Sequence, residues 1–406
     1  MLLFFIKFLQ TQFGLHVPAV FSYSSTRMLL SAITTLLITI LLGPFVIRRL
    51  YALTTGQSFR VEDCPPVLTK LHQKKKNIPT MGGVLILGAM LISLFLWMDL
   101  TSTFTLILFF VTLALGLVGG ADDYLKLKHK SSKGLRARKK FILQILIAGS
   151  VALYIYFFPA ALEKGRFFKP PVAKVQTQSI RAGDLNASSE TLSMQEYMRL
   201  FFFPFKKGAL FTLAGALAIF GVLITIFVVT GASNAVNLTD GLDGLAPGTL
   251  VMTAGVFALF AFLSNHLDFA RYLNILYIEG SGEIAIFLCG MIGACLGFLW
   301  YNGYPAQLFM GDTGSLALGG VLGISAILLR REFLLALSGG IFVIEALSVI
   351  LQVGSYKLRN KKRIFLCTPI HHHFECKGWP ETKVVLRFWI VAFILAMLAI
   401  ISLKFQ

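Results

Sequence analysis

The chain has 406 residues, of which 56% are hydrophobic and 14% charged, and its mean hydropathy is +0.77. This composition excludes a soluble globular domain and a disordered chain, and it is typical of a protein that crosses a membrane several times. The formal net charge of +18 sits mainly between apolar segments, so we expect membrane lipid as a partner and no nucleic acid.

Ten apolar segments predict the architecture. A helix needs about 20 mostly apolar residues to cross a bilayer, so the expected fold class is an all-α polytopic integral membrane protein with about ten transmembrane helices. Residues 1–27, which polar residues interrupt, are predicted to form an N-terminal interfacial segment, and residues 28–406 a single membrane-embedded domain. The expected spans are residues 28–47, 80–98, 103–120, 140–158, 209–230, 247–264, 284–301, 315–330, 333–356 and 385–404.

Basic residues predict the orientation. They are concentrated in the loops 48–76, 126–140 and 357–383, which an alternating topology places on one side of the membrane. The positive-inside rule makes that side cytoplasmic, and ten spans then put both termini outside. The loop 159–207 carries eight basic residues on the extracytoplasmic side, but long loops weigh less in this rule.

A polar run between the fifth and sixth expected spans is the strongest functional signal. Within residues 234–244 stand Asn234, Asn237, Asp240 and Asp243. Polar and ionisable groups beside the hydrocarbon are costly, which makes them functional candidates by default. Capping one helix end requires fewer polar side chains than these four, so the run predicts part of an active site.

Three further polar motifs fall on the same predicted side. Asp122 and Asp123 end the third span, Asp312 precedes the eighth, and the histidines at 371–373 lie between the ninth and tenth. Taken singly, an aspartate at a helix end is commonly only a cap. Because all four sites share one side of an alternating topology, we predict an active site on the cytoplasmic face.

The residue types predict magnesium and phosphate chemistry. Mg²⁺ prefers oxygen ligands and usually reaches its substrate through one or two carboxylates and phosphate oxygens, while Lys and His side chains bind phosphates. Asp240 and Asp243 are three residues apart and would share one face of a helix. Asp122 and Asp123 would point about 100° apart on a helix, which predicts different roles for them.

Two other classes of protein stay open. Cys367, His371, His373 and Cys376 could hold zinc, although their spacing is irregular and no Cys-x-x-Cys occurs. An ion-coupled transporter would also place carboxylates in membrane helices, but near the bilayer midplane and in matched halves of the chain. The carboxylates of this chain stand at the ends of the expected spans, on one side, which favours an enzyme.

Five segments resemble the signature loops of one family. The resemblance is to the bacterial phospho-N-acetylmuramoyl-pentapeptide transferases, which belong to the polyprenyl-phosphate N-acetylhexosamine-1-phosphate transferase superfamily. It extends from about residue 48 to the last span, and Asn77-Ile78 stands where the family usually has Gly-Thr. The segments are PTMGG at 79–83, DDY at 122–124, NAVNLTDGLDGL at 234–245, FMGDTGS at 309–315 and PIHHHFE at 369–375.

The resemblance implies a reaction and a location. The reaction is Mg²⁺-dependent transfer of phospho-N-acetylmuramoyl-pentapeptide from UDP-N-acetylmuramoyl-pentapeptide to undecaprenyl phosphate, giving UMP and lipid I for peptidoglycan synthesis. The location is the bacterial inner (plasma) membrane. The resemblance is also compatible with a homodimer. The alternative within the superfamily transfers N-acetylglucosamine-1-phosphate from UDP-N-acetylglucosamine to polyprenyl phosphate. The His-His-His-Phe-Glu run at 371–375 favours the muramoyl substrate.

The resemblance also implies roles for individual residues. Asp312 is the expected direct Mg²⁺ ligand, with Asp240 beside it in the metal shell, and Asp122 would act on the lipid phosphate with support from Asp123. The expected catalytic residues are Asp122, Asp123, Asp240, His371 and His372. The expected substrate-binding residues are Lys75, Lys126, Asn234, Asn237 and Asp243.

The histidine run is expected in an extended or turn conformation. In such a conformation alternate side chains point to opposite sides, so the three imidazoles cannot all face one ligand. The two that the resemblance favours as functional are His371 and His372, which leaves His373 with a structural role. Glu375 is expected to organise the loop.

Overall fold

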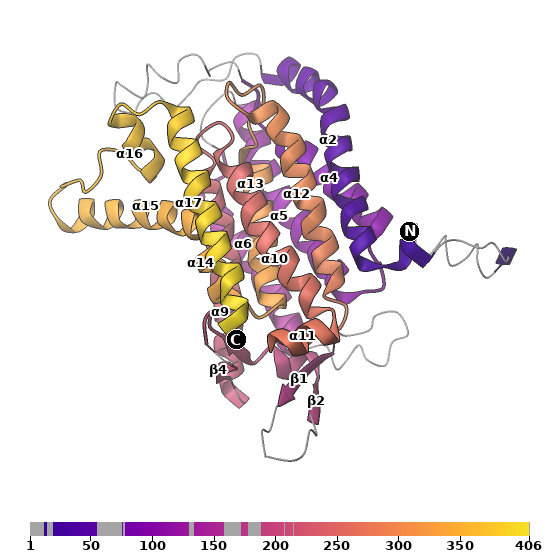
Figure 1. Cartoon of the computed structure of the whole chain (residues 1–406). Helices are drawn as coiled ribbons and strands as arrows, with labels where there is room; N and C mark the ends of the chain where they lie inside the picture. The colour runs from indigo at the N-terminus through magenta and orange to yellow at the C-terminus, as the bar shows by residue number, and fades with distance from the viewer. Residues whose placement is uncertain are drawn as a thin grey trace.

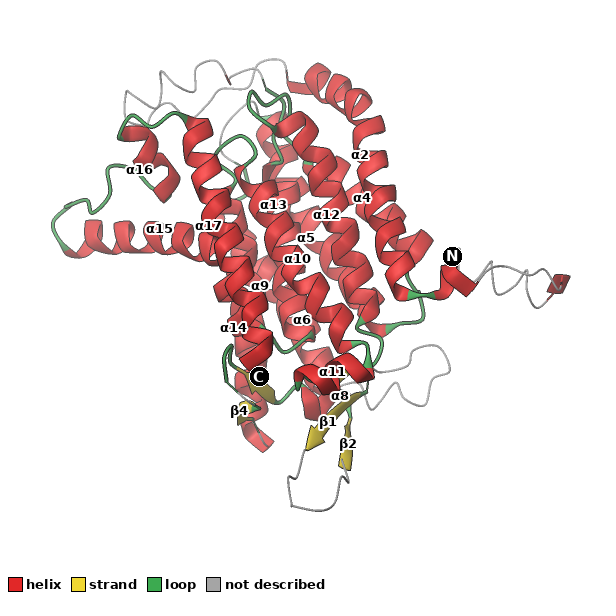
Figure 2. Ribbon diagram, viewed as in Figure 1, coloured by secondary structure: helices red, strands yellow, loops and turns green. Residues whose placement is uncertain are grey.

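The computed structural model describes residues 12–13, 19–54, 75, 78–129, 134–157, 172–177, 188–206, 208–213 and 215–405. Long helices lie side by side in a bundle, which Figure 1 shows coloured by residue number and Figure 2 by secondary structure. Nine helices within these described residues are long and apolar enough to cross a membrane. They are α2 (Ser24–Thr54), α5 (Thr103–Lys128), α6 (Ala137–Phe157), α9 (Ala218–Thr239), α10 (Leu245–Ser264), α12 (Gly282–Asn302), α13 (Gly311–Leu328), α15 (Gly340–Leu358) and α17 (Glu381–Ile401).

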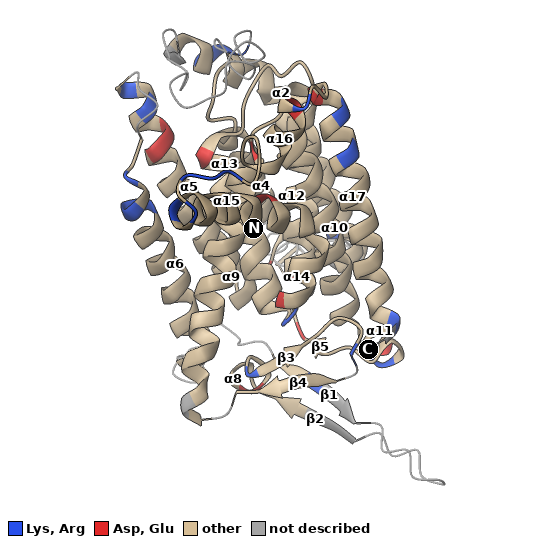
Figure 3. Cartoon of the chain, turned by 90° about the vertical axis from the view of Figure 1, so that its left-hand side faces the viewer, with Lys and Arg blue, Asp and Glu red and all other residues tan. Residues whose placement is uncertain are grey.

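These helices confirm the expected fold class. Each of the ten predicted spans overlaps a helix, and the second one is α4 (Gly83–Trp97), which at 15 residues is the short member of the set. The long middle stretches of α6, α9 and α17 carry no charged residue (Figure 3), as a bilayer interior demands. Helix α13 lies at the centre of the bundle, because every residue from 313 to 328 is buried.

The fifth span begins later than the sequence predicts. Instead of a helix over 209–230, Ala209–Thr212 form the strand β4 and Gly215–Leu217 a single 3₁₀ turn, so that α9 starts at Ala218. The helix then continues to Thr239. Asn234 and Asn237 therefore lie in its last turns, and the expectation that they stand in a connecting loop is wrong.

Strand pairing explains this shift. A short apolar stretch fits a strand as well as a helix, so its neighbours decide between them. Strand β4 pairs antiparallel with β3 (Leu200–Phe202), and the rings of Phe201 and Phe211 stack with their centroids 4.8 Å apart. The pairing satisfies the backbone of residues that the sequence pattern assigned to the membrane.

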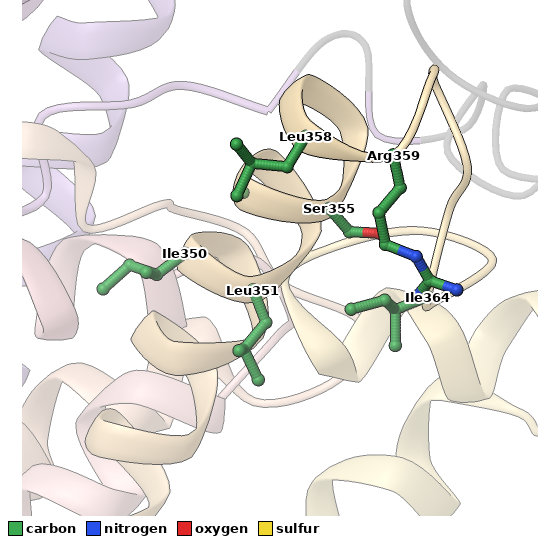
Figure 4. A pocket seen from close by; sticks show the side chains of 7 residues that line it. Ile350, Leu351, Ser355, Leu358, Arg359 and Ile364 are labelled. Carbon is green, nitrogen blue, oxygen red and sulfur yellow. The ribbon is translucent and has the colours of Figure 1, made fainter.

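The ninth predicted span, 333–356, is divided into two helices. The short helix α14 (Glu332–Ser338) is followed by Gly339, and α15 then lies crosswise to the bundle helices and extends outward from the bundle, as Figures 1 and 2 show. Adjacent glycines at 339 and 340 weaken a helix at this point, which permits the change of direction. Beside the outer part of α15 is a cavity of about 420 Å³ (Figure 4), lined by Ile350, Leu351, Gly354, Ser355, Leu358, Arg359 and Ile364.

The strands lie at one end of the bundle, and the short helix α16 (Ile370–Cys376) lies at the other (Figure 1). The predicted loop 159–207 contains β1 (Ala173–Thr177), β2 (Ser188–Leu192), α8 (Met194–Tyr197) and β3. Strand β1 pairs antiparallel with both β2 and β5 (Tyr277–Ile278). Residues 158–171 and 178–187 lie outside the described residues.

The remaining elements are short. Much of the predicted N-terminal segment, residues 1–11 and 14–18, lies outside the described residues, and α2 begins four residues before the predicted span. The short elements are η1 (Ala19–Ser22), α11 (Leu267–Leu273) and η4 (Ser402–Phe405).

Candidate active site

Three carboxylates meet where α5 ends and α13 begins. Asp122 and Asp123 come from the last two turns of α5 and Asp312 from the first turn of α13, and their ligand oxygens all lie within 4.8 Å of one another. Gly119 makes this approach possible, because a Cβ there would lie 2.2 Å from the Asp312 carbonyl oxygen. The sequence identified these three aspartates as site residues, and the packing of the two helices brings them together.

Two lysines neutralise part of this acidic cluster. The Lys126 Nζ lies 2.5 Å from Asp122 Oδ2 and 3.2 Å from Asp312 Oδ2. The Lys140 Nζ lies 2.5 Å from the same oxygen of Asp312. Lys126 was predicted in the site, whereas Lys140 was counted only as a loop charge. Its signal was present in the sequence: Lys140 is one helical turn before Gln144, whose polar side chain is buried within an apolar helix.

Asp123 is committed to the start of α13. Its carboxylate accepts hydrogen bonds from the Thr313 N–H (2.9 Å), the Thr313 hydroxyl (2.7 Å) and the Asp312 N–H (3.3 Å). These are the donors that a helix N-terminus leaves without intrahelical partners. Asp123 therefore caps the start of α13, which is the role that Asp312 would have if it were only a helix cap. The Asp312 carboxylate is left facing the lysines.

Asp122 is covered by the connection between α5 and α6. Its Oδ1 accepts a hydrogen bond from the Leu135 N–H at 2.8 Å. A Cβ at Gly134 would lie 2.6 Å from that oxygen, so the backbone approaches the carboxylate more closely than a side chain would allow. The two neighbouring aspartates thus have different surroundings, in line with the different roles predicted for them.

The two asparagines of α9 point to different neighbours. The Asn237 amide donates to Asp312 Oδ1 and to the Ser315 hydroxyl, both at 2.8 Å, so it belongs to the cluster. The Asn234 amide donates to Gln144 Oε1 and to the Thr230 carbonyl, also both at 2.8 Å, and ties α9 to α6. Asn234 therefore lies in the packing between helices, beside the site.

Asp240 and Asp243 do not share a helical face, contrary to the prediction. Helix α9 ends at Thr239 and α10 begins at Leu245, so both residues lie in the turn between them. Gly244 has a φ of +80°, a left-handed conformation that favours glycine and turns the chain here. Burial and the nearby charges of Asp312 and Asp123 raise the pKa of Asp240 to about 7.

This raised pKa predicts how stability depends on pH. A carboxyl group whose pKa is higher in the folded state does not change the free energy of unfolding below about pH 4, where it is protonated in both states. As pH rises from there towards 7, this group lowers the free energy of unfolding progressively. In a chelating buffer, Asp240→Asn should raise the melting temperature at pH 8 by a few degrees and should raise it less at pH 5. A variant that melts lower than the wild type at pH 8 would contradict this.

Lys75 and Asp243 belong to a second cluster. The Lys75 Nζ lies 2.6 Å from Asp243 Oδ1 and 2.6 Å from Glu381 Oε1. Glu381 also accepts a hydrogen bond from the Asp243 N–H at 2.8 Å, and Asp243 Oδ2 accepts one from the Ala306 N–H at 3.0 Å. Glu381 was not among the predicted site residues; it stands in the first turn of α17, which begins four residues before the predicted last span.

The histidines are helical, so the prediction of an extended or turn conformation is wrong. Pro369 precedes α16, and the 3.6-residue period turns each imidazole about 100° from the next. The ring of His371 is fully buried, with its Nδ1 3.1 Å from Glu345 Oε1. His372 Nδ1 lies 2.7 Å from Glu375 Oε2, and His373 Nδ1 accepts a hydrogen bond from the Leu366 N–H at 3.1 Å.

Comparison with known proteins places this arrangement in a family. The model for glycosyl transferase family 4 matches residues 105–330, and phospho-N-acetylmuramoyl-pentapeptide-transferase signature 1 matches residues 75–87. A phospho-N-acetylmuramoyl-pentapeptide-transferase of Protochlamydia amoebophila is 60% identical over 100% of both chains. Those of Thermodesulfovibrio yellowstonii and Desulfotalea psychrophila are 45% and 44% identical over 95% of each chain.

The chain belongs to the phospho-N-acetylmuramoyl-pentapeptide-transferase family.

The segment that this family's signature matches holds the loop before Asp312. The N–H groups of Gly82 and Gly83 donate to the carbonyls of Phe309 and Met310, both at 2.8 Å, and the Phe309 N–H donates to the Pro79 carbonyl at 2.9 Å. A Cβ at Gly83 would lie 2.1 Å from the Gly314 nitrogen. The PTMGG motif therefore does more than start a span, since its backbone fixes the entry to α13.

The zinc hypothesis has no support within the described residues. The group of side chains there that could hold a metal ion is Asp122, Asp123 and Asp312, whereas His371 faces Glu345 and His373 accepts from a backbone N–H. We expect the double variant Cys367→Ser, Cys376→Ser to keep wild-type activity and to bind as little zinc as the wild type. Zinc that co-purifies with the wild type and is lost with activity in this variant would reverse the conclusion.

Proposed function

We propose that the protein transfers phospho-N-acetylmuramoyl-pentapeptide from its UDP carrier to undecaprenyl phosphate, with UMP as the second product. The observation that carries the proposal is the cluster of three carboxylates and two lysines at helix ends, in a chain 60% identical to a phospho-N-acetylmuramoyl-pentapeptide-transferase. A site at helix ends suits a lipid phosphate held at the headgroup level and a nucleotide that arrives from water.

The donors fit a magnesium ion. Mg²⁺ prefers oxygen ligands from one or two carboxylates together with phosphate oxygens, and the oxygens of Asp122 and Asp312 lie close enough to share one ion. Asp123 is less available, because its carboxylate already accepts three hydrogen bonds. We therefore propose Asp312 and Asp122 as the residues that would hold Mg²⁺, with Asp240 near them. When bound, the ion would neutralise charge on the phosphates.

The other charged residues of the cluster support phosphoryl transfer. That reaction depends on holding the attacking and leaving oxygens in line and on neutralising the phosphates. Lys126 and Lys140 present ammonium groups beside Asp312, where phosphate oxygens would find them. Asn237, which donates to Asp312, would keep that carboxylate oriented.

For Asp122 we predict a positioning role in place of a general base. A phosphate with a second pKa of about 6 has little proton left to lose at neutral pH. Asp122→Asn should therefore lower the turnover number strongly while the acidic limb of the pH–rate profile keeps its midpoint. Loss of that limb in the variant would assign Asp122 as the titrating base.

The orientation and assembly form part of the proposal. Basic loops predict that the end of the bundle carrying α16 faces the cytoplasm, in the inner membrane of a bacterium. A cysteine placed at the exposed Lys139 should react with a membrane-impermeant maleimide only after cells are opened. Family resemblance also supports a homodimer, which crosslinking in native membranes can test.

One assay tests the reaction and separates it from the runner-up. Purified protein receives Mg²⁺, undecaprenyl phosphate and either UDP-N-acetylmuramoyl-pentapeptide or UDP-N-acetylglucosamine, and UMP release is measured. We expect release with the first nucleotide sugar alone. Release with UDP-N-acetylglucosamine alone would replace the proposal with the N-acetylglucosamine-1-phosphate alternative, and release with neither would reject both.

A further inference from the structure

Glu345 is a buried carboxylate for which the site described above gives no role. It comes from α15, and its side chain is completely shielded from solvent. The side chain found beside its carboxylate among the described residues is His371, whose Nδ1 lies 3.1 Å from Glu345 Oε1. A carboxylate without water or a partner is strongly unfavourable, so the position of this imidazole and the presence of this glutamate depend on each other.

The other edge of the imidazole packs against the turn between α9 and α10. A Cβ at Gly241 would lie only 2.4 Å from His371 Nε2, so the ring rests on the backbone beside Asp240. The His372 ring lies edge-on to His371, with the centroids 4.2 Å apart. The His371 ring is thus held between α15 and the turn that carries Asp240.

A polar stripe on α15 holds the chain segment that leads into α16. Gln352, two helical turns beyond Glu345, accepts hydrogen bonds from the Ile364 and Phe365 N–H groups, both at 3.0 Å. The Ser355 hydroxyl donates to the Lys362 carbonyl at 2.9 Å. These contacts fix the backbone before α16 without Glu345. Among the described residues, the contact found for the glutamate carboxylate is the one to the His371 ring.

We propose that Glu345 is a positioning residue, which holds His371 against the Asp240–Gly241 turn in the ring orientation that the transfer reaction requires. A carboxylate beside one imidazole nitrogen fixes which nitrogen carries the proton and how the ring is turned. Here Nδ1 faces Glu345 and Nε2 faces the turn. The proposal rests on the proposed function, because it assigns a residue to that reaction.

Two replacements at position 345 and one control replacement elsewhere test this in the full-length enzyme. Glu345→Gln keeps an acceptor oxygen but loses the charge, Glu345→Met loses both, and Glu332→Gln is the matched control. Glu332 is also buried, but it pairs with Arg330 where α13 leads into α14, at the end of the bundle that carries the strands. We expect Glu345→Met to lower kcat on the order of 10- to 100-fold, Glu345→Gln to lower it less, and both to leave KM unchanged. The control should keep the wild-type kcat.

A double-mutant cycle separates positioning from general support of the fold. In a His371→Gln background, Glu345→Met should cause no further loss of kcat, since the ring it positions is gone. An equal loss in both backgrounds, or a change in KM alone, would overturn the proposal. If the wild type releases no UMP, the proposed function fails. The same cycle on melting temperature then still decides whether the two side chains are coupled, and additive shifts would reject the contact.

Discussion

Replacing Asp312 by asparagine is expected to abolish UMP release, with a loss on the order of 1,000-fold. The Asp312 carboxylate contacts Lys126, Lys140 and the Asn237 amide at the same time. Asparagine keeps the size of the side chain but removes the charge that would hold Mg²⁺ and balance the lysines. The variant should still fold and insert, since Asp123 makes the hydrogen bonds at the start of α13.

The measurement is initial rate against Mg²⁺ concentration in detergent or nanodiscs, with melting temperature as the folding check. Asp268→Asn is the matched control, because Asp268 is an exposed residue of α11. It should behave as the wild type does. Full activity of Asp312→Asn at ordinary Mg²⁺ concentration would remove Asp312 from the site.

Removing either lysine of the cluster is the second large effect we expect. Lys126→Ala and Lys140→Ala should each lower kcat/KM on the order of 100-fold, because charge-assisted contacts to phosphates are among the strong hydrogen bonds. Both ammonium groups lie within 3.2 Å of Asp312 Oδ2. Lys75→Ala should weaken nucleotide-sugar binding separately, since Lys75 belongs to the cluster with Asp243 and Glu381.

Two neighbouring lysines are the controls for this prediction. Lys128, the last residue of α5, and Lys139, in the first turn of α6, carry the same charge, but both are exposed and lie outside the cluster. Their alanine variants should keep nearly full kcat/KM, and Lys130, which lies outside the described residues, is predicted to tolerate the change as well. Equal losses at all of these positions would mean that the connection acts only through its net charge.

The positions of the helices follow from the sequence to a large extent. Long apolar stretches can satisfy their backbone in a bilayer only as helices, so ten segments were enough to predict the bundle. Two boundaries could not be obtained this way. Residues 209–212 pair with β3 as a strand, and the segment 333–356 divides at Gly339. In both cases hydrophobicity alone does not distinguish the possible structures.

The composition of the site was predictable, but its connections were not. Asp122, Asp123 and Asp312 stand at helix ends on one predicted side, which sequence position and topology reveal. The sequence could not show that Asn237 faces Asp312 while Asn234 faces Gln144, because this depends on where α9 ends. Nor could it connect Lys140 with Asp312 or Glu345 with His371.

Those connections were decided by tertiary packing, for a physical reason. The local sequence pattern indicates which residues avoid lipid. Contacts between residues that lie 26 to 172 positions apart depend instead on how closely the helices approach one another. Gly119 lets α5 approach α13, and Gly241 lets the His371 ring rest on the α9–α10 turn. The sequence by itself determined a membrane bundle with acidic, basic and histidine residues at one end. Only the packing at these glycines decided which charges meet.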